Sequence, residues 1–197
     1  MTPSIPDRLP VDGSLLDHGV VWPADAADAL LRSLLTAIPW QHDQVVLYGK
    51  TITTARQVCW MGDEAYTYRY SGDRKVAQPW PPAVLPVKSH IEALTGERFN
   101  SCLANLYPTG QQGVSWHSDA EPELGPTPTI ASVSLGAARR FVLRHRERDL
   151  EVEVLLRHGS LIVMCGQSQA RWKHQLPKMA RVHSPRVNLT FRQILSS

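Results

Sequence analysis

The sequence predicts a single α+β domain whose core is a mostly antiparallel β-roll. Two stretches with the apolar spacing of helices lie in the first half of the chain, and successive stretches with the alternation of strands follow residue 99. A chain of 197 residues is long enough for one well-packed domain but short for two full ones. We therefore expect one domain over residues 1–197, with N-terminal helices joined by short strands and turns over 1–98 and a strand-rich core over 99–197.

The two predicted helices are marked by prolines and a glycine at their ends. The stretch PADAADALLRSLLTAIPW places Pro23 at a first-turn position, and its apolar side chains repeat with helical spacing until Pro39. A second helix is predicted over residues 82–95, with Gly96 just past its end. Residues 44–72, which lie between them, have the turn glycines and alternating tyrosines of short strands.

From residue 99 onward, short apolar stretches are separated by turn residues, which is typical of an antiparallel barrel or sandwich. Within the first stretch, Leu103, Asn105 and Tyr107 fall on one face, so an amide and a phenol point the same way. The predicted strands are FNSCLANLY, IASVSLG, RRFVLRHR, LEVEVLL, SLIVMC and RVNLTFR.

Composition and charge narrow the class of protein. No apolar run is long enough to cross a bilayer, and the N-terminus lacks the basic start and apolar stretch of a signal peptide. Three scattered cysteines suggest neither a disulfide framework nor a zinc ribbon. The net charge of +3 is compatible with a polyanionic partner but does not identify one. We expect a cytosolic protein, or a nuclear one if the source is a eukaryote.

The segment WHSD contains the first candidate ligands for a metal. On an extended chain His117 and Asp119 project to the same side, and His174 follows later in RWKHQLP. Two histidines and one carboxylate are the ligand set of non-haem Fe(II) sites with open coordination positions. The chain has eight histidines, so surface or satisfied core histidines are the alternative interpretation.

The stretch RVNLTFR alternates polar and apolar residues without a break. Its polar face is either a wetted outer face of a sheet or the inner face of a barrel that holds an anion. The stretch begins twelve residues after His174, so a barrel would place its polar face beside the candidate metal ligands. An arginine there can bind a carboxylate through two parallel hydrogen bonds, which favours a dicarboxylate as the ligand. The residues of the polar face are Arg186, Asn188, Thr190 and Arg192.

Together these motifs resemble those of the AlkB-type 2-oxoglutarate- and Fe(II)-dependent dioxygenases, which repair alkylated bases. The resemblance covers most of the chain from about residue 44 to the end, and it rests on NLY, WHSD, IASVSLG, HGSLIVM, His174 and RVNLTFR. VLYGK and TYRYSG are most similar to pieces of the branch that acts on duplex DNA in animals. The resemblance implies a double-stranded β-helix (jelly-roll) core with flanking helices and an N-terminal nucleotide-recognition lid.

The same resemblance implies an activity: oxidative demethylation of bases such as 1-methyladenine and 3-methylcytosine in DNA, with release of formaldehyde and succinate. Fe(II) is the implied cofactor, and 2-oxoglutarate and oxygen are the implied co-substrates. The implied metal ligands are His117, Asp119 and His174. The implied 2-oxoglutarate pocket consists of Asn105, Tyr107, Arg186, Asn188, Thr190 and Arg192, with the two arginines at the two ends of the co-substrate.

Contacts with the nucleic acid are also implied by the resemblance. Tyr48 aligns with a hairpin-tip aromatic, phenylalanine in the duplex-DNA branch, which fills the stack when the damaged base is flipped out. At Ala120 the animal branch has an acid, so the resemblance does not give the base preference. The implied substrate-binding residues are Tyr48, Gly49, Lys50, Arg56, Tyr68, Tyr70, Ser71 and Glu121.

The chemistry of the lesion supports some of these roles. A base methylated at a ring nitrogen is cationic, and aromatic faces with a carboxylate stabilise a planar cation. Tyr68, Tyr70 and Glu121 supply such groups, although the tyrosines suit the packing of a strand equally well.

Two alternatives to a DNA demethylase remain at this point. One is an oxygenase of the same family that acts on RNA or protein, and the other is a non-catalytic nucleic-acid-binding module. The expected partner is DNA carrying alkylated bases, with RNA as the alternative, and we expect a monomer without a membrane partner.

Overall fold

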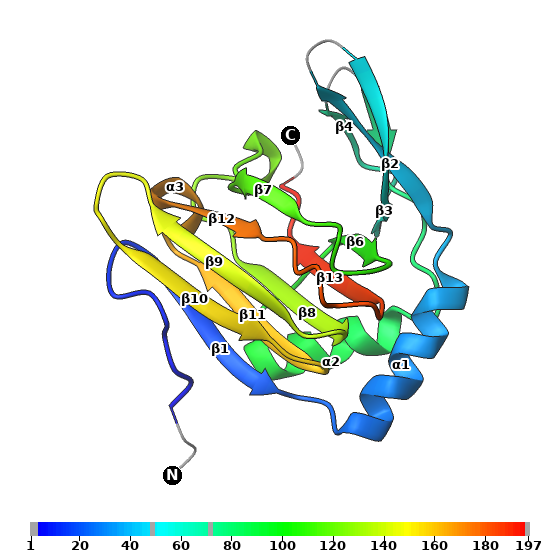
Figure 1. Ribbon diagram of the computed structural model, residues 1–197, viewed down its shortest axis with the longest axis horizontal. Coiled ribbons are helices and arrows are strands. Elements are labelled where there is room, and N and C mark those ends of the chain that lie inside the picture. Colours follow the sequence, from blue (N-terminus) through cyan, green and yellow to red (C-terminus); the bar gives the residue numbers. More distant parts are fainter. Residues whose placement is uncertain (1–3, 48–49, 71–72, 196–197) are drawn as a thin grey trace.

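The computed structural model describes residues 4–47, 50–70 and 73–195 (Figure 1). Two antiparallel sheets face each other, and two helices cover the outer side of the larger sheet. The larger sheet has the strand order β1-β11-β8-β13-β6-β3-β2, and the smaller has the order β10-β9-β12-β7. This arrangement is the jelly-roll core that the resemblance implied.

The strands of the larger sheet come from both halves of the chain. They are β1 (Ser14–Val20), β2 (Gln41–Leu47), β3 (Lys50–Gly62), β6 (Ser101–Tyr107), β8 (Ile130–Gly136), β11 (Ser160–Cys165) and β13 (Arg186–Arg192). The smaller sheet contains β7 (Val114–His117), β9 (Arg139–His145), β10 (Glu151–Leu156) and β12 (Trp172–Leu176). A separate two-stranded sheet joins β4 (Thr67–Tyr70) to β5 (Asp73–Val76).

The predicted helices are confirmed, with one change of boundary. Helix α1 (Ala24–Ala37) begins after Pro23 and ends before Pro39, as the apolar spacing predicted. Helix α2 (Leu85–Thr95) ends at Gly96, whose φ of 75° suits a glycine. Its start lies three residues later than predicted, because residues 81–84 form a turn in which the Val84 N–H donates to the Pro81 carbonyl. The described part of the chain also contains the short helices η1 (Pro122–Leu124) and α3 (Ser168–Arg171).

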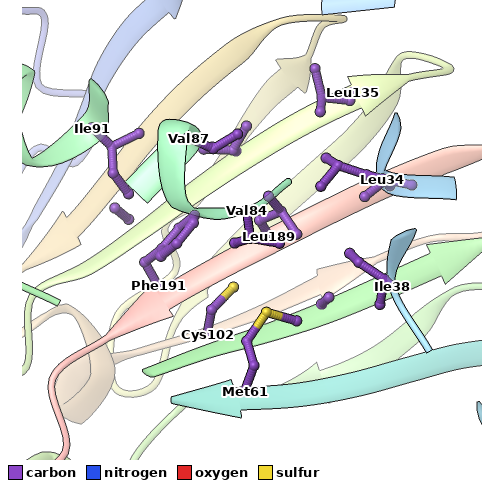
Figure 2. Packing of buried hydrophobic residues seen from close by; sticks show 14 of the residues in the cluster. Leu34, Ile38, Met61, Val84, Val87, Ile91, Cys102, Leu135, Leu189 and Phe191 are labelled. Carbon is purple, nitrogen blue, oxygen red and sulfur yellow. The ribbon is translucent and has the colours of Figure 1, made fainter. Parts of the chain in front are cut away.

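Strand β13 occupies the middle of the larger sheet, hydrogen-bonded to β6 on one side and β8 on the other. All seven of its residues are buried. Val187, Leu189 and Phe191 belong to the cluster that packs against the helices. Figure 2 shows Leu189 and Phe191 on the same side of β13 as Leu34 and Val87. The polar residues of β13 alternate with them and face the space between the sheets. The interpretation of RVNLTFR as a wetted outer face is therefore wrong.

The space between the sheets has an apolar part and a polar part. Its apolar part is a second hydrophobic cluster, which includes Phe141, Leu143, Leu156, Ile162 and Trp172. Its polar part lies against β13, β6 and β7, where buried arginine, asparagine, threonine and aspartate side chains are concentrated. Within the described residues, the helices are all too short or too polar to span a membrane.

Candidate metal and co-substrate site

Strands β7 and β12 bring the three predicted metal ligands together at one end of the polar interior. His174 on β12 lies directly opposite His117, the last residue of β7, and their ring centroids are 4.3 Å apart. Asp119 follows His117 by two residues, and its Oδ1 lies 3.8 Å from His117 Nε2. One possible ligand atom from each of the three residues lies within 4.8 Å of the other two. This spacing suits a single metal ion.

The hydrogen bonding of His117 and the pKa of His174 also suit a metal. His117 Nδ1 lies 2.8 Å from the Ser115 carbonyl, and donation of its proton there leaves the Nε2 lone pair facing Asp119. Burial lowers the pKa of His174 to about 4, despite the opposing charge of Asp119, so the ring is neutral at neutral pH. Two imidazole nitrogens and a carboxylate oxygen are a ligand set that Fe(II) accepts.

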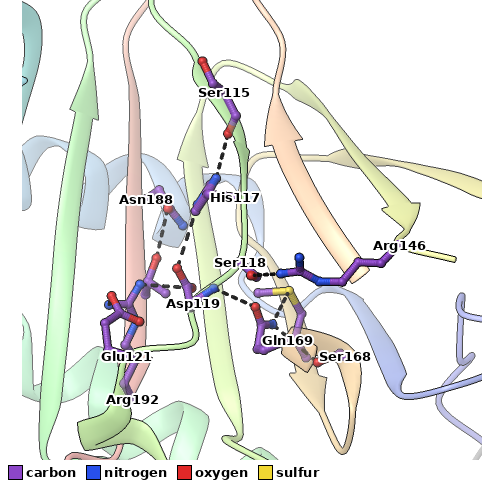
Figure 3. A network of polar contacts seen from close by, with 12 residues as sticks. Ser115, His117, Ser118, Asp119, Glu121, Arg146, Ser168, Gln169, Asn188 and Arg192 are labelled. Atoms are coloured by element: carbon purple, nitrogen blue, oxygen red, sulfur yellow. Dashed lines mark hydrogen bonds and ion pairs between the residues drawn. The ribbon is translucent and has the colours of Figure 1, made fainter. Parts of the chain in front are cut away.

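The carboxylate of Asp119 is buried, and a cation keeps it ionised. Burial alone would raise its pKa, but the adjacent Arg192, with smaller contributions from His174 and His117, holds the pKa below its usual range. Arg192 Nη2 lies 3.0 Å from Asp119 Oδ2 (Figure 3). Its Nη1 lies 3.7 Å from Oε1 of Glu121. Arg192 thus joins a candidate metal ligand to a predicted substrate residue.

Arg186 lies at the other end of β13 and is 2% exposed. Its Nη2 donates to Ser134 Oγ at 2.8 Å, and its guanidinium carbon lies 5.3 Å from the centroid of the Tyr107 ring. Burial lowers the pKa of Arg186 to about 10, so the group stays charged at neutral pH. None of the described carboxylates pairs with this cation, and its Nε has no hydrogen-bond partner among the described residues. A buried cation without an acidic partner suits an anionic ligand.

Tyr107 and two further arginines surround the same end. Arg56 of β3 forms an ion pair with the buried Asp43, and it also contacts the phenol of Tyr107. Arg56 was predicted to contact nucleic acid, and the structure places it beside the predicted co-substrate pocket instead of on an open surface. The guanidinium carbon of Arg139 lies over the same ring, 5.8 Å from its centroid. A direct contact of Arg56 with nucleic acid stays a prediction.

Arg139 is a residue of this site that the sequence analysis missed. It is fully buried, and it donates to the carbonyls of Gln112 at 2.7 Å and Pro177 at 2.8 Å. These hydrogen bonds tie the β6–β7 loop to the β12–β13 loop. The sequence did contain a signal that the Arg139 side chain points inward. Arg139 lies two and four residues before the apolar Phe141 and Leu143, so the three side chains fall on one face of the strand.

The amide and hydroxyl side chains of the predicted pocket differ in how many hydrogen bonds they already form within the sheet. They belong to Asn188, Thr190 and Asn105. Asn188 Nδ2 donates to Ser132 Oγ and to the Val133 carbonyl, both at 2.9 Å, and its Oδ1 accepts from Thr190 at 3.1 Å. Asn105 lies opposite Asn188, and its buried Oδ1 has no partner among the described residues. Asn105 therefore has a free acceptor toward the interior, whereas Asn188 and Thr190 are already bonded.

The predicted lid residues fall in the part of the chain that projects from the larger sheet. Figure 1 shows β2, β3 and β4 extending away from the core. Lys50 begins β3, and Tyr68 and Tyr70 lie on β4. Tyr48, Gly49 and Ser71 lie outside the described residues. The lid and its contacts with nucleic acid stay predictions.

Comparisons with known proteins agree with this geometry. Human alpha-ketoglutarate-dependent dioxygenase alkB homolog 3 is 39% identical over 180 residues, which cover 85% of this chain and 62% of that protein, less than two thirds of its length. Mouse DNA oxidative demethylase ALKBH2 is 37% identical over 199 residues, covering 95% of this chain and 83% of that protein. The solved structure of OsALKBH1 has a TM-score of 0.62 at 18% identity, covering 94% of this chain and 98% of that one, and supports the fold.

A family model described as the 2OG-Fe(II) oxygenase superfamily matches residues 14–192. This match includes the three candidate metal ligands and both ends of β13. The chain belongs to the 2OG-Fe(II) oxygenase superfamily.

Proposed function

We propose that the protein is an Fe(II)- and 2-oxoglutarate-dependent dioxygenase that demethylates N-alkylated bases in DNA. The observation that carries this proposal is a two-histidine, one-carboxylate cluster, half-buried at His117 and buried at its other two residues, together with Arg186, a buried cation that has no acidic partner among the described residues. The similarity to mouse DNA oxidative demethylase ALKBH2 supports the choice of substrate. The expected monomeric state, and the expected location in the cytosol or nucleus, stay predictions.

In this proposal the residues of the chain bind and orient the reactants. His117, Asp119 and His174 would hold the iron, Arg186 would bind one carboxylate, and Tyr107 and Asn105 would complete the pocket. Iron, 2-oxoglutarate and oxygen together supply the oxidation of the methyl group, which leaves as formaldehyde while 2-oxoglutarate becomes succinate and carbon dioxide. Arg192 keeps Asp119 ionised and therefore able to bind a cation.

Glu121 is the described residue best placed to contact the base. Its Oε1 faces Arg192, whereas its buried Oε2 has no hydrogen-bond partner among the described residues. A ring-methylated base is cationic, so a free carboxylate oxygen near the metal ligands would favour it over the neutral base. The predicted aromatic wall, Tyr68 and Tyr70, would add attraction to the face of the cation.

The test is formaldehyde release from matched oligonucleotides, each with one 1-methyladenine or 3-methylcytosine, as single- or double-stranded DNA or RNA. With Fe(II), 2-oxoglutarate and oxygen, we expect release from methylated DNA and none from unmethylated DNA. Release from RNA or a methylated peptide but not from DNA would reassign the substrate. Failure to form succinate with any of them would favour a non-catalytic binding module.

The first prediction concerns the metal ligands. His117→Ala, Asp119→Ala and His174→Ala should each abolish formaldehyde release, because each removes one of three protein ligands. The exposed His183 provides the matched control, and His183→Ala should leave the rate unchanged. Circular dichroism should show that the variants stay folded. A near wild-type rate in any ligand variant would remove that residue from the metal site.

The second prediction concerns Arg186. Arg186→Lys keeps a positive charge but loses the planar fork that holds a carboxylate through two hydrogen bonds. We expect the concentration of 2-oxoglutarate needed for half-maximal rate to rise about tenfold or more, equivalent to roughly 1.4 kcal/mol. The control is Arg140→Lys on β9 of the smaller sheet, because Arg140 is exposed and forms an ion pair with Glu153. An unchanged requirement would mean that Arg186 does not bind the co-substrate.

The third prediction concerns Tyr48, the aromatic at the predicted hairpin tip. An aromatic ring inserted into the gap left by a flipped base recovers about 1–3 kcal/mol of stacking, and a single strand offers no such gap. Tyr48→Ala should therefore lower the rate on methylated duplex DNA by about tenfold or more, with little change on the same lesion in single-stranded DNA. Equal losses on both substrates, with a lower melting temperature, would instead indicate cross-strand packing in the hairpin.

A further inference from the structure

Asp119 lies on a loop although its two partner ligands lie on strands. Strand β7 ends at His117, and the described ladder between β7 and β12 ends with the His117–His174 pair. The next element, η1, begins only at Pro122. The backbone of Asp119 therefore needs another partner to fix the direction of its carboxylate.

Gln169 supplies that partner from a distant part of the chain. Its Oε1 accepts a hydrogen bond from the backbone N–H of Asp119 at 2.9 Å (Figure 3). Gln169 is 2% exposed, and its Nε2 lies 3.4 Å from both Met164 Sδ and Ser168 Oγ. Because only the oxygen of a carboxamide can accept a hydrogen bond from an N–H group, this contact fixes the orientation of the side chain.

The segment that carries Gln169 also carries a candidate metal ligand. Gln169 lies in α3, and His174 lies five residues later on β12. Gly13 packs against the start of α3 so closely that a Cβ on it would lie 2.4 Å from Ser168 N. The indole N–H of Trp172 donates to the Val11 carbonyl at 3.2 Å. These contacts hold α3 and the start of β12 against the segment that precedes β1.

We propose that Gln169 is a positioning residue for the metal centre, which it serves by fixing the backbone of Asp119. This inference rests on the metal site proposed above. Without the acceptor, the buried N–H of Asp119 would have no partner among the described residues, and the loop would have to move to satisfy it. Such a movement turns the carboxylate away from the two histidines. Residues that orient metal ligands in this way typically change metal affinity by about 10- to 100-fold when they are replaced.

The test compares Mn(II) affinity in Gln169→Met and Ser168→Ala. Methionine fills a similar volume but lacks the acceptor, whereas Ser168→Ala removes a neighbouring buried hydroxyl and leaves Oε1 in place. Mn(II) binding to the whole chain, measured by the electron paramagnetic resonance signal of free Mn(II), should weaken about tenfold or more in Gln169→Met. Ser168→Ala should bind Mn(II) like the wild type.

A second measurement separates positioning from a general effect on folding. In the metal-free protein, amide exchange at Asp119 should accelerate in Gln169→Met and stay slow in Ser168→Ala. If Gln169→Met does not fold, Gln169→Asn replaces it, because its side chain is one methylene shorter and its oxygen falls short of Asp119. A folded variant with a lower melting temperature but unchanged Mn(II) affinity would overturn the inference.

Asp119→Ala distinguishes failure of this inference from failure of the metal site itself. Loss of Mn(II) binding in Asp119→Ala, with full binding in the Gln169 variant, would overturn the role of Gln169 alone. Equal binding by the wild type and Asp119→Ala, or no binding by the wild type, would overturn the metal centre and the inference together.

Discussion

The burial of both faces of β13 is the constraint on which the rest of the structure depends. The strand lies between β6 and β8, so its backbone is paired on both sides, and its apolar face closes the core with the helices. Its polar face must then lie between the two sheets, where each buried guanidinium loses its hydration. Arg192 recovers part of that loss through Asp119, whereas the partners of Arg186 among the described residues are the Ser134 hydroxyl and Tyr107, neither of them a carboxylate. The polar interior is therefore a place where an anion is stabilised.

Burial acts in opposite directions on the two kinds of candidate metal ligand. It favours the neutral forms of both His174 and Asp119, but Arg192 reverses the effect for the carboxylate. The result is a neutral imidazole beside an ionised carboxylate, the states in which both groups bind a metal without first releasing a proton. The same cation that keeps Asp119 charged also faces Glu121, so the charges of the metal site and of the proposed base pocket are linked.

The features that the sequence predicts are those set by neighbours along the chain. Prolines bound α1, strict alternation marks β13, and a spacing of two puts His117 and Asp119 on one side. Strand β1 was missed because its partner, β11, lies far away in the sequence and a bulge between Asp17 and Gly19 interrupts its alternation. Gln169 was missed for a related reason, since its contact with Asp119 joins residues fifty positions apart and no local pattern marks it.

The two ends of the polar interior are built differently, and this asymmetry gives the proposed co-substrate a direction. At the Arg186 end, Arg139 ties two loops together through carbonyl groups, and Gly110 fits so closely that a Cβ on it would lie 1.9 Å from the Met179 carbonyl. No room remains there for a side chain. At the other end Arg192 adjoins the metal ligands and Glu121. A ligand with an acid group at only one end would interact with only one of these two ends of the polar interior. A dicarboxylate would place one acid group against Arg186 at the closed end and direct the other toward the metal ligands.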